Sequence, residues 1–190
     1  MNKVPGAIVL LWLLVSCVSD RAAPPHEIFD EQSAMTLSVV SQPLVFARDR
    51  SDVAAHARDY ATVVAAEIDR SGDYTDFLLL YRWSTVDRRM APPPPQSAGA
   101  LRIVADGRVI DLKPMERLPV SLTQSRALFV PPHSDIIPRA YAVDAALLQH
   151  IAACRSLTLH MPQEELNTPF ALFQDGRKAL TNFLRSINGV

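Results

Sequence analysis

The sequence predicts an α+β fold: a mainly antiparallel β-sheet with two amphipathic helices in the C-terminal third packed on the sheet. Two observations lead to this class. Strand-like apolar patterns fill most of the chain from Met35 to Leu112, whereas sustained helical spacing appears only in two segments after residue 142. Turn-forming residues separate the strand-like segments at short intervals, which favours hairpins over parallel crossovers.

The first strand-like segment runs from Met35 to Ala47. Pro43 interrupts it, because proline has no N–H to donate to a sheet. A short helix is predicted over 51–58, with Ser51 or Asp52 as its N-cap.

The best-defined pair of strands is predicted at 60–68 and 77–86. The first of these segments is apolar on both of its faces, as in a strand at the centre of a sheet. The residues between them, 69–73, are dense in turn formers. We therefore expect this hairpin to form the middle of the sheet.

A second hairpin is predicted over 101–112, because Asp106-Gly107 supplies the positive φ angles that a tight turn needs. Two further strands are predicted at 118–122 and 127–130, followed by a loop up to Pro138. The segment 143–154 has helical spacing with Asp144 as a cap. Strands follow at 157–161 and 170–173, and a last helix runs from Asp175 to the stop signal Asn188-Gly189.

The N-terminal seventeen residues have the three-part shape of a secretory signal: a cation at Lys3, an uncharged apolar run from Val4 to Ser16, and a small residue before Cys17. A helix of thirteen residues is roughly 20 Å long, too short to span a hydrocarbon core of about 30 Å. The chain is accordingly divided into a signal peptide over 1–17, a flexible tether over 18–34 and a single globular domain over 35–190.

The end of the apolar run, Leu14-Val15-Ser16-Cys17, resembles the lipobox of bacterial lipoproteins. The resemblance implies that Cys17 receives a diacylglyceryl group, that the preceding peptide is removed and that the new amino terminus is acylated. It also implies a membrane partner through this lipid, on the periplasmic side of the envelope. Val18, which follows the cysteine, favours the outer membrane over the inner one. The alternative is an ordinary secretory signal cut after Ala23, which Pro24 disfavours.

Composition excludes several classes of function. Without Lys3 the chain has 18 Lys and Arg against 20 Asp and Glu, so it lacks the basic field that nucleic acid requires. Cys154 is the only cysteine besides Cys17, which excludes a framework of disulfides. We expect Cys154 to be buried and inert, with an intermolecular disulfide as the alternative.

No recognisable catalytic or metal-binding pattern is present in the sequence. The five histidines are far apart and form no ligand motif, so neither a cofactor nor a metal is expected. We expect His150 and His160 to bond to neighbouring backbone groups. His133-Ser134-Asp135 contains the residue types of a hydrolase triad, but adjacent loop residues do not adopt that geometry with one another.

One surface is predicted as a partner contact, where charged residues follow a strand and adjoin a stiff polyproline loop. Its residues are Arg82, Arg88, Arg89, Pro92, Pro93, Pro94 and Pro95. The favoured function is a non-enzymatic, lipid-anchored binding or assembly component of the envelope with an envelope protein as partner. The alternatives are an inhibitor or immunity-type lipoprotein of the periplasm and an envelope enzyme of unrecognised type.

Overall fold

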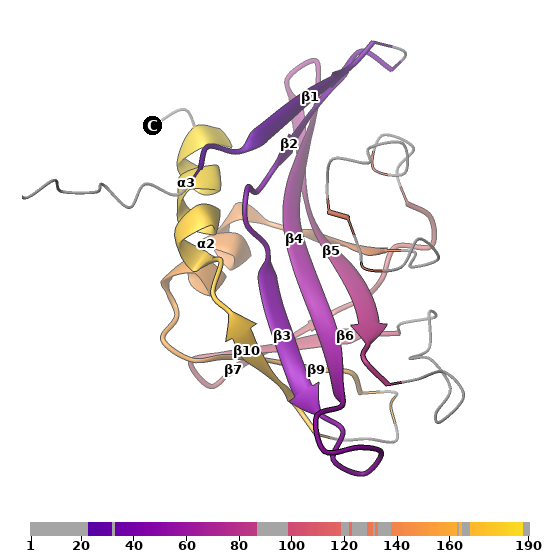
Figure 1. Ribbon diagram of the computed structural model, residues 1–190. Coiled ribbons are helices and arrows are strands. Elements are labelled where there is room, and N and C mark those ends of the chain that lie inside the picture. The colour runs from indigo at the N-terminus through magenta and orange to yellow at the C-terminus, as the bar shows by residue number, and fades with distance from the viewer. Residues whose placement is uncertain are drawn as a thin grey trace, which may run out of the picture.

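The computed structural model describes residues 23–31, 33–86, 99–118, 122, 129–130, 132, 138–162, 164 and 168–187. These residues form one ten-stranded antiparallel sheet and two helices, so the α+β class is confirmed (Figure 1). The elements are β1 (His26–Asp30), β2 (Met35–Val39), β3 (Leu44–Asp49), β4 (Arg58–Arg70), β5 (Asp73–Ser84), β6 (Leu101–Ala105), β7 (Arg108–Leu112), β8 (Arg139–Val143), α2 (Ala145–Ala153), β9 (Leu157–His160), β10 (Phe170–Gln174) and α3 (Arg177–Ile187).

The hairpin of β4 and β5 is the centre of the sheet, as predicted. Twelve residue pairs join the two strands, from Asp59 opposite Ser84 to Arg70 opposite Asp73. Ser71 and Gly72 make the turn with φ angles of 56° and 91°, and the Asp69 carboxylate accepts a hydrogen bond from the Gly72 N–H at 2.7 Å. Both faces of β4 are buried along most of its length.

β4 is long enough to pair with two strands along its other edge. Its first half pairs with β3 and its second half with β2, and β1 pairs with β2. The strand that pairs with this edge of β4 changes from β2 to β3 around Pro43, where the sequence predicts an interruption. Beyond β3 the sheet continues through β10, β9, β6 and β7, while in the other direction β5 pairs with β8.

The sheet curls so far that two of its terminal strands, β7 and β8, come close to each other. Just after β7, the Met115 N–H donates a hydrogen bond to the carbonyl oxygen of Ala140 on β8, at 2.8 Å. Further along, β7 and β8 line opposite sides of a cavity. β7 and β8 are therefore joined at one point and diverge beyond it.

α2 and α3 lie side by side (Figure 1). Leu148 and Ile151 of α2 are buried, as are four apolar side chains of α3: Ala179, Leu180, Phe183 and Leu184. These residues belong to the same buried cluster as the strand residues Phe46, Leu101 and Phe170.

Position 176, just before α3, requires a glycine because two segments of the backbone approach each other closely there. A Cβ atom added here would lie 2.7 Å from the carbonyl oxygen of Gln42 and would also collide with the backbone of Pro43. No larger residue fits without moving one of the two segments. The start of α3 is thereby held against the connection between β2 and β3.

Three sequence predictions are wrong in part. The tether predicted over 18–34 includes β1, because His26–Asp30 pairs with β2 over five residues. The helix predicted over 51–58 is a series of turns, in which the Arg50 N–H bonds to the Ala57 carbonyl at 2.8 Å. In the predicted strands at 118–122 and 127–130, the described residues lie outside strands and Leu122 is helical.

Several predictions fall outside the described residues. These are the signal peptide with Cys17, the motif His133-Ser134-Asp135, and the partner-contact residues Arg88, Arg89, Pro92, Pro93, Pro94 and Pro95. Within the described part of the chain, neither helix has the length and apolarity that a membrane crossing needs.

Candidate functional site

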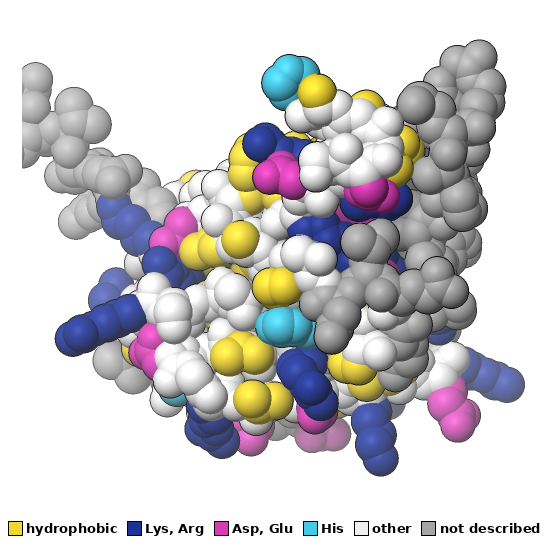
Figure 2. Space-filling model, turned by 90° about the horizontal axis from the view of Figure 1, so that it is seen from below, with side chains coloured by type: hydrophobic (Ala, Val, Ile, Leu, Met, Phe, Trp, Pro, Cys, Tyr) yellow, Lys and Arg dark blue, Asp and Glu magenta, His cyan; other side chains and the backbone are white. Residues whose placement is uncertain are grey.

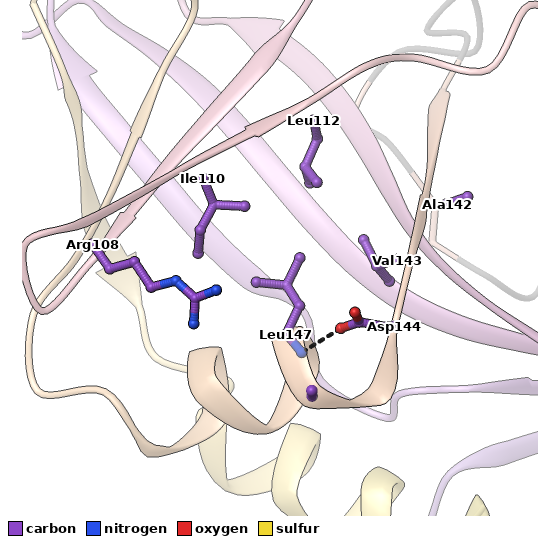
Figure 3. A pocket seen from close by; sticks show the side chains of 8 residues that line it. Arg108, Ile110, Leu112, Ala142, Val143, Asp144 and Leu147 are labelled. Carbon is purple, nitrogen blue, oxygen red and sulfur yellow. Dashed lines mark hydrogen bonds between the residues drawn. The ribbon is translucent and has the colours of Figure 1, made fainter.

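The candidate site is a cavity of about 520 Å³ between the two ends of the sheet and the start of α2 (Figure 3). β7, β8 and α2 contribute its lining: Arg108, Ile110, Leu112, Ala142, Val143, Asp144, Ala146 and Leu147. Most of these side chains are apolar. Ligand sites typically have roughly 300–1,000 Å³ and a mainly apolar lining with few polar groups, and the volume of this cavity lies within that range.

The tight turn of the β6–β7 hairpin holds β7 in place. Asp106 has a φ of 48°, and its carboxylate accepts hydrogen bonds from the backbone N–H groups of Arg155 and Ser156 at 2.9 and 2.8 Å. These bonds, that from Ser156 first, lower the pKa of Asp106. His150 on α2 lies 3.3 Å from the carbonyl oxygen of Ala105 through its Nε2, a backbone partner as predicted. The hairpin is thus attached to the residues at the end of α2.

The cavity has a cation at one end and a carboxylate at the other (Figure 3). Asp144 is the N-cap of α2, and its carboxylate accepts a hydrogen bond from the Leu147 N–H at 2.7 Å. Arg108 is exposed and points along the cavity. No hydrogen bond or ion pair joins Arg108 to another of the described residues. Its guanidinium is therefore the group available to an incoming anion.

A second cluster of charges is buried beside the ends of β3, β4 and β5. Arg48 donates a hydrogen bond to Asp59 at 2.9 Å and forms an ion pair with Glu164 at 2.8 Å, and Arg82 forms an ion pair with the other oxygen of Glu164. Arg50 adds a contact to Asp59 at 3.2 Å. Burial acts to raise the pKa of Asp59, but hydrogen bonds from Ser84 and Arg48 outweigh it and lower that pKa. We call these residues the ionic cluster: Arg48, Arg50, Asp59, Arg82 and Glu164.

The ionic cluster corrects one predicted partner-contact residue. The sequence places Arg82 on an exposed rim, but its side chain is only 8% exposed and is paired with Glu164. The strand pattern assigns Arg82 to the same face as Phe46 and Ala61, both of which are buried. Arg82 therefore joins the loop that carries Glu164 to the sheet.

A third feature is a pair of carboxylates on neighbouring strands. Glu67 on β4 lies directly opposite Asp76 on β5, and Asp76 lies opposite the cavity residue Val143 on β8. Burial, followed by repulsion from Asp76 and Asp69, raises the pKa of Glu67 to about 7. Burial and Asp144 also raise the pKa of Asp76.

A fourth feature is a group of aromatic residues. Their side chains lie on the face of the sheet opposite to that of Glu67. Tyr60 and Trp83 are stacked with ring centroids 3.9 Å apart, and the Phe173 ring meets Tyr60 edge-on at 5.6 Å. Phe173 is 57% exposed and lies at an irregularity in the pairing of β10 with β3. On the face of the molecule in Figure 2, apolar side chains lie among charged side chains of both signs.

Cys154 is buried, as predicted, and its thiol donates to the Ile151 carbonyl at 3.1 Å. Burial raises the pKa of this thiol, which lowers its reactivity at neutral pH. Among the described residues, no group of three or more His, Cys, Asp or Glu side chains is arranged to hold a metal ion.

Sequence reasoning did not find the cavity. It requires β8, which lies between the loop predicted up to Pro138 and the helix predicted from Val143 and to which the sequence assigns no strand, and it requires β7 to lie near β8 although 26 residues separate the two strands. The only local signals were the Asp106-Gly107 turn and the Asp144 cap.

The chain matches no protein-family model, and comparison with curated proteins and with solved structures gives no match either.

We predict that Glu164→Gln destabilises the protein by about 3–5 kcal/mol, because it removes one of two carboxylates that compensate buried guanidinium groups. Urea unfolding measures the loss. The matched control is Asp111→Asn, which breaks the exposed ion pair with Arg102 and is expected to cost less than about 1 kcal/mol. Equal losses for the two variants would contradict a structural role for the ionic cluster.

We predict that Glu67→Gln stabilises the protein near pH 8 and that this advantage shrinks as the pH falls toward 4.5. The pKa of Glu67 is about 7 in the folded chain, against an ordinary value of 4.5 for a solvated glutamate, so in this interval the folded state binds more protons than the unfolded state. The wild-type stability contributed by Glu67 therefore falls as pH rises through the interval. Melting curves from pH 4 to 8 test the prediction, and a constant difference between the variants would refute it.

Proposed function

We propose that the protein is a non-enzymatic, lipid-anchored binding component of the bacterial envelope, and that the cavity between β7, β8 and α2 receives its ligand. The observation that carries the proposal is the cavity itself, which combines a mainly apolar lining with one available cation at Arg108. A binding role needs no further group, since apolar contact supplies affinity and the cation supplies orientation.

The envelope location rests on the lipobox-like residues Leu14-Val15-Ser16-Cys17. With Cys17 as the lipid site, eight residues separate the lipid from His26, where β1 begins. Eight extended residues reach at most about 28 Å, so the domain stays close to the membrane surface. The residue Val18 supports the outer membrane as the location, and the partner is an envelope protein.

We also propose that α2 and α3 are amphipathic helices that pack on the sheet and complete its core. The burial of Ile151, Leu180 and Phe183 supports this arrangement.

The inhibitor-type function remains a second proposal. The exposed Phe173 and the half-buried Tyr60 support it, because they lie with Trp83 near the end of β5, where the chain continues into the predicted partner-contact residues. These remaining residues are Arg88, Arg89, Pro92, Pro93, Pro94 and Pro95.

We predict that the mature chain begins at a diacylated and N-acylated Cys17. Mass spectrometry of the purified amino terminus checks this directly. Cys17→Ser should move the protein out of the membrane fraction without changing its melting temperature. Recovery of an unmodified chain that begins after Ala23 would refute the anchor.

We predict that a photo-reactive benzoylphenylalanine at Ala146, on the rim of the cavity, crosslinks an envelope protein in living cells. The same residue in place of Phe29, which is 63% exposed on β1, should give no such product. Leu147→Glu should abolish the product, because it places a charge in the apolar lining. Crosslinks from both positions, or none from Ala146, would contradict the proposed site.

A further inference from the structure

The cavity lies where the sheet is incomplete. Among the described residues, β7 and β8 each pair with one neighbour only, β6 and β5 respectively, so both are terminal strands of the sheet. The hydrogen bond from Met115 to Ala140 joins them at one end. Beyond that bond the strands separate, and the cavity opens between β7, β8 and α2 (Figure 3).

The tight turn determines which backbone groups of β7 face the opening. In a two-residue hairpin the flanking residues, Ala105 and Arg108, exchange hydrogen bonds, and so do the pairs two and four residues further along. The N–H and C=O groups of Val109 and Asp111 therefore point away from β6. Within the described part of the chain, no residue provides a backbone partner for Val109 or Asp111 on that side.

Side chains beside this free edge suit one apolar and one anionic group. Ile110 of β7, Val143 of β8 and Leu147 of α2 line the cavity. Arg108 lies two residues from Ile110 and therefore on the same face of β7. The Asp144 carboxylate, at the other end, disfavours an anion there.

We propose that an extended peptide segment of a partner protein adds as an antiparallel strand to the free edge of β7. Its backbone pairs with Val109 and Asp111, one apolar side chain enters the cavity opposite Ile110, and a carboxylate two residues later meets Arg108. This mode is β-strand addition, in which backbone bonds give affinity and alternate side chains give specificity. The inference rests on the proposed function of the cavity as a binding site.

The direction of the peptide follows from the positions of the charges. A strand antiparallel to β7 places its later residues opposite the beginning of β7, where Arg108 lies. The preferred order is therefore apolar residue, any residue, acidic residue. The reverse order places the acid toward Met115 and Ala140, away from Arg108.

The probe is the peptide acetyl-Thr-Thr-Leu-Thr-Asp-Thr-amide, titrated into the purified full chain and followed by NMR. We expect slowed hydrogen exchange at the amides of Val109 and Asp111. N-methylation of the two Thr residues that flank Leu should weaken binding by about tenfold or more, because it removes backbone hydrogen bonds and leaves the side chains unchanged.

Two protein variants test the side-chain contacts. Arg108→Gln should weaken binding by about threefold to tenfold and remove the preference over the reversed peptide acetyl-Thr-Asp-Thr-Leu-Thr-Thr-amide. Leu147→Glu should abolish binding, and it keeps α2 intact because Glu three residues after the cap Asp144 is a favourable capping-box position. Arg185→Gln, on α3, is the matched control and should bind as the wild type does.

The outcomes separate this inference from the proposed function. If crosslinking from Ala146 persists but the peptide fails to bind, or binds equally well when N-methylated, the cavity remains a binding site and strand addition is overturned. If crosslinking fails as well, both are overturned. A concentration-dependent dimer that involves the β7 edge would show that a second copy of the chain, rather than a partner peptide, occupies it and would also overturn the proposal.

Discussion

The sheet depends on one constraint: β4 is thirteen residues long and carries strands on both edges. β5 takes one edge for its whole length, while β3 and β2 divide the other edge between them. Because β2 and β3 pair with different halves of the same edge of β4, two separate series of strands extend from that edge. The series that runs from β3 through β10, β9 and β6 to β7 therefore curls separately from the β1–β2 hairpin, and this curling brings β7 close to β8.

The buried polar groups lie on this frame in two different arrangements. Arg48 and Arg82 meet carboxylates of opposite charge, so each charge compensates part of the other's loss of water. Glu67 and Asp76 are instead two acids on neighbouring strands, and burial, more than repulsion from nearby carboxylates, raises the pKa of each. The first arrangement connects a loop to the sheet, whereas the second makes the charge of the sheet near the cavity depend on pH.

The sequence predicted the elements whose signals are local. The β4–β5 and β6–β7 hairpins follow from the turn formers around Ser71-Gly72 and at Asp106-Gly107 between apolar segments, and the two helical segments follow from their apolar spacing. β1 was missed because its exposed, polar pattern resembles a tether. The cavity and the ionic cluster were missed because they depend on strand order: Arg82 has the sequence context of a solvated strand-end residue, and only the fold brings Glu164 next to it across 82 residues of chain.

The first strand also has a consequence for the solubility of the folded molecule. β1 is short, largely exposed and carries Glu27 and Asp30, and it pairs with every residue of β2. β2, in contrast, has the buried apolar residues Leu37 and Val39. A protease that removed β1 would leave the backbone edge of an apolar strand open, and such an edge is a template for sheet-to-sheet aggregation. The few residues of β1 thus act as a protective border for the core of the sheet.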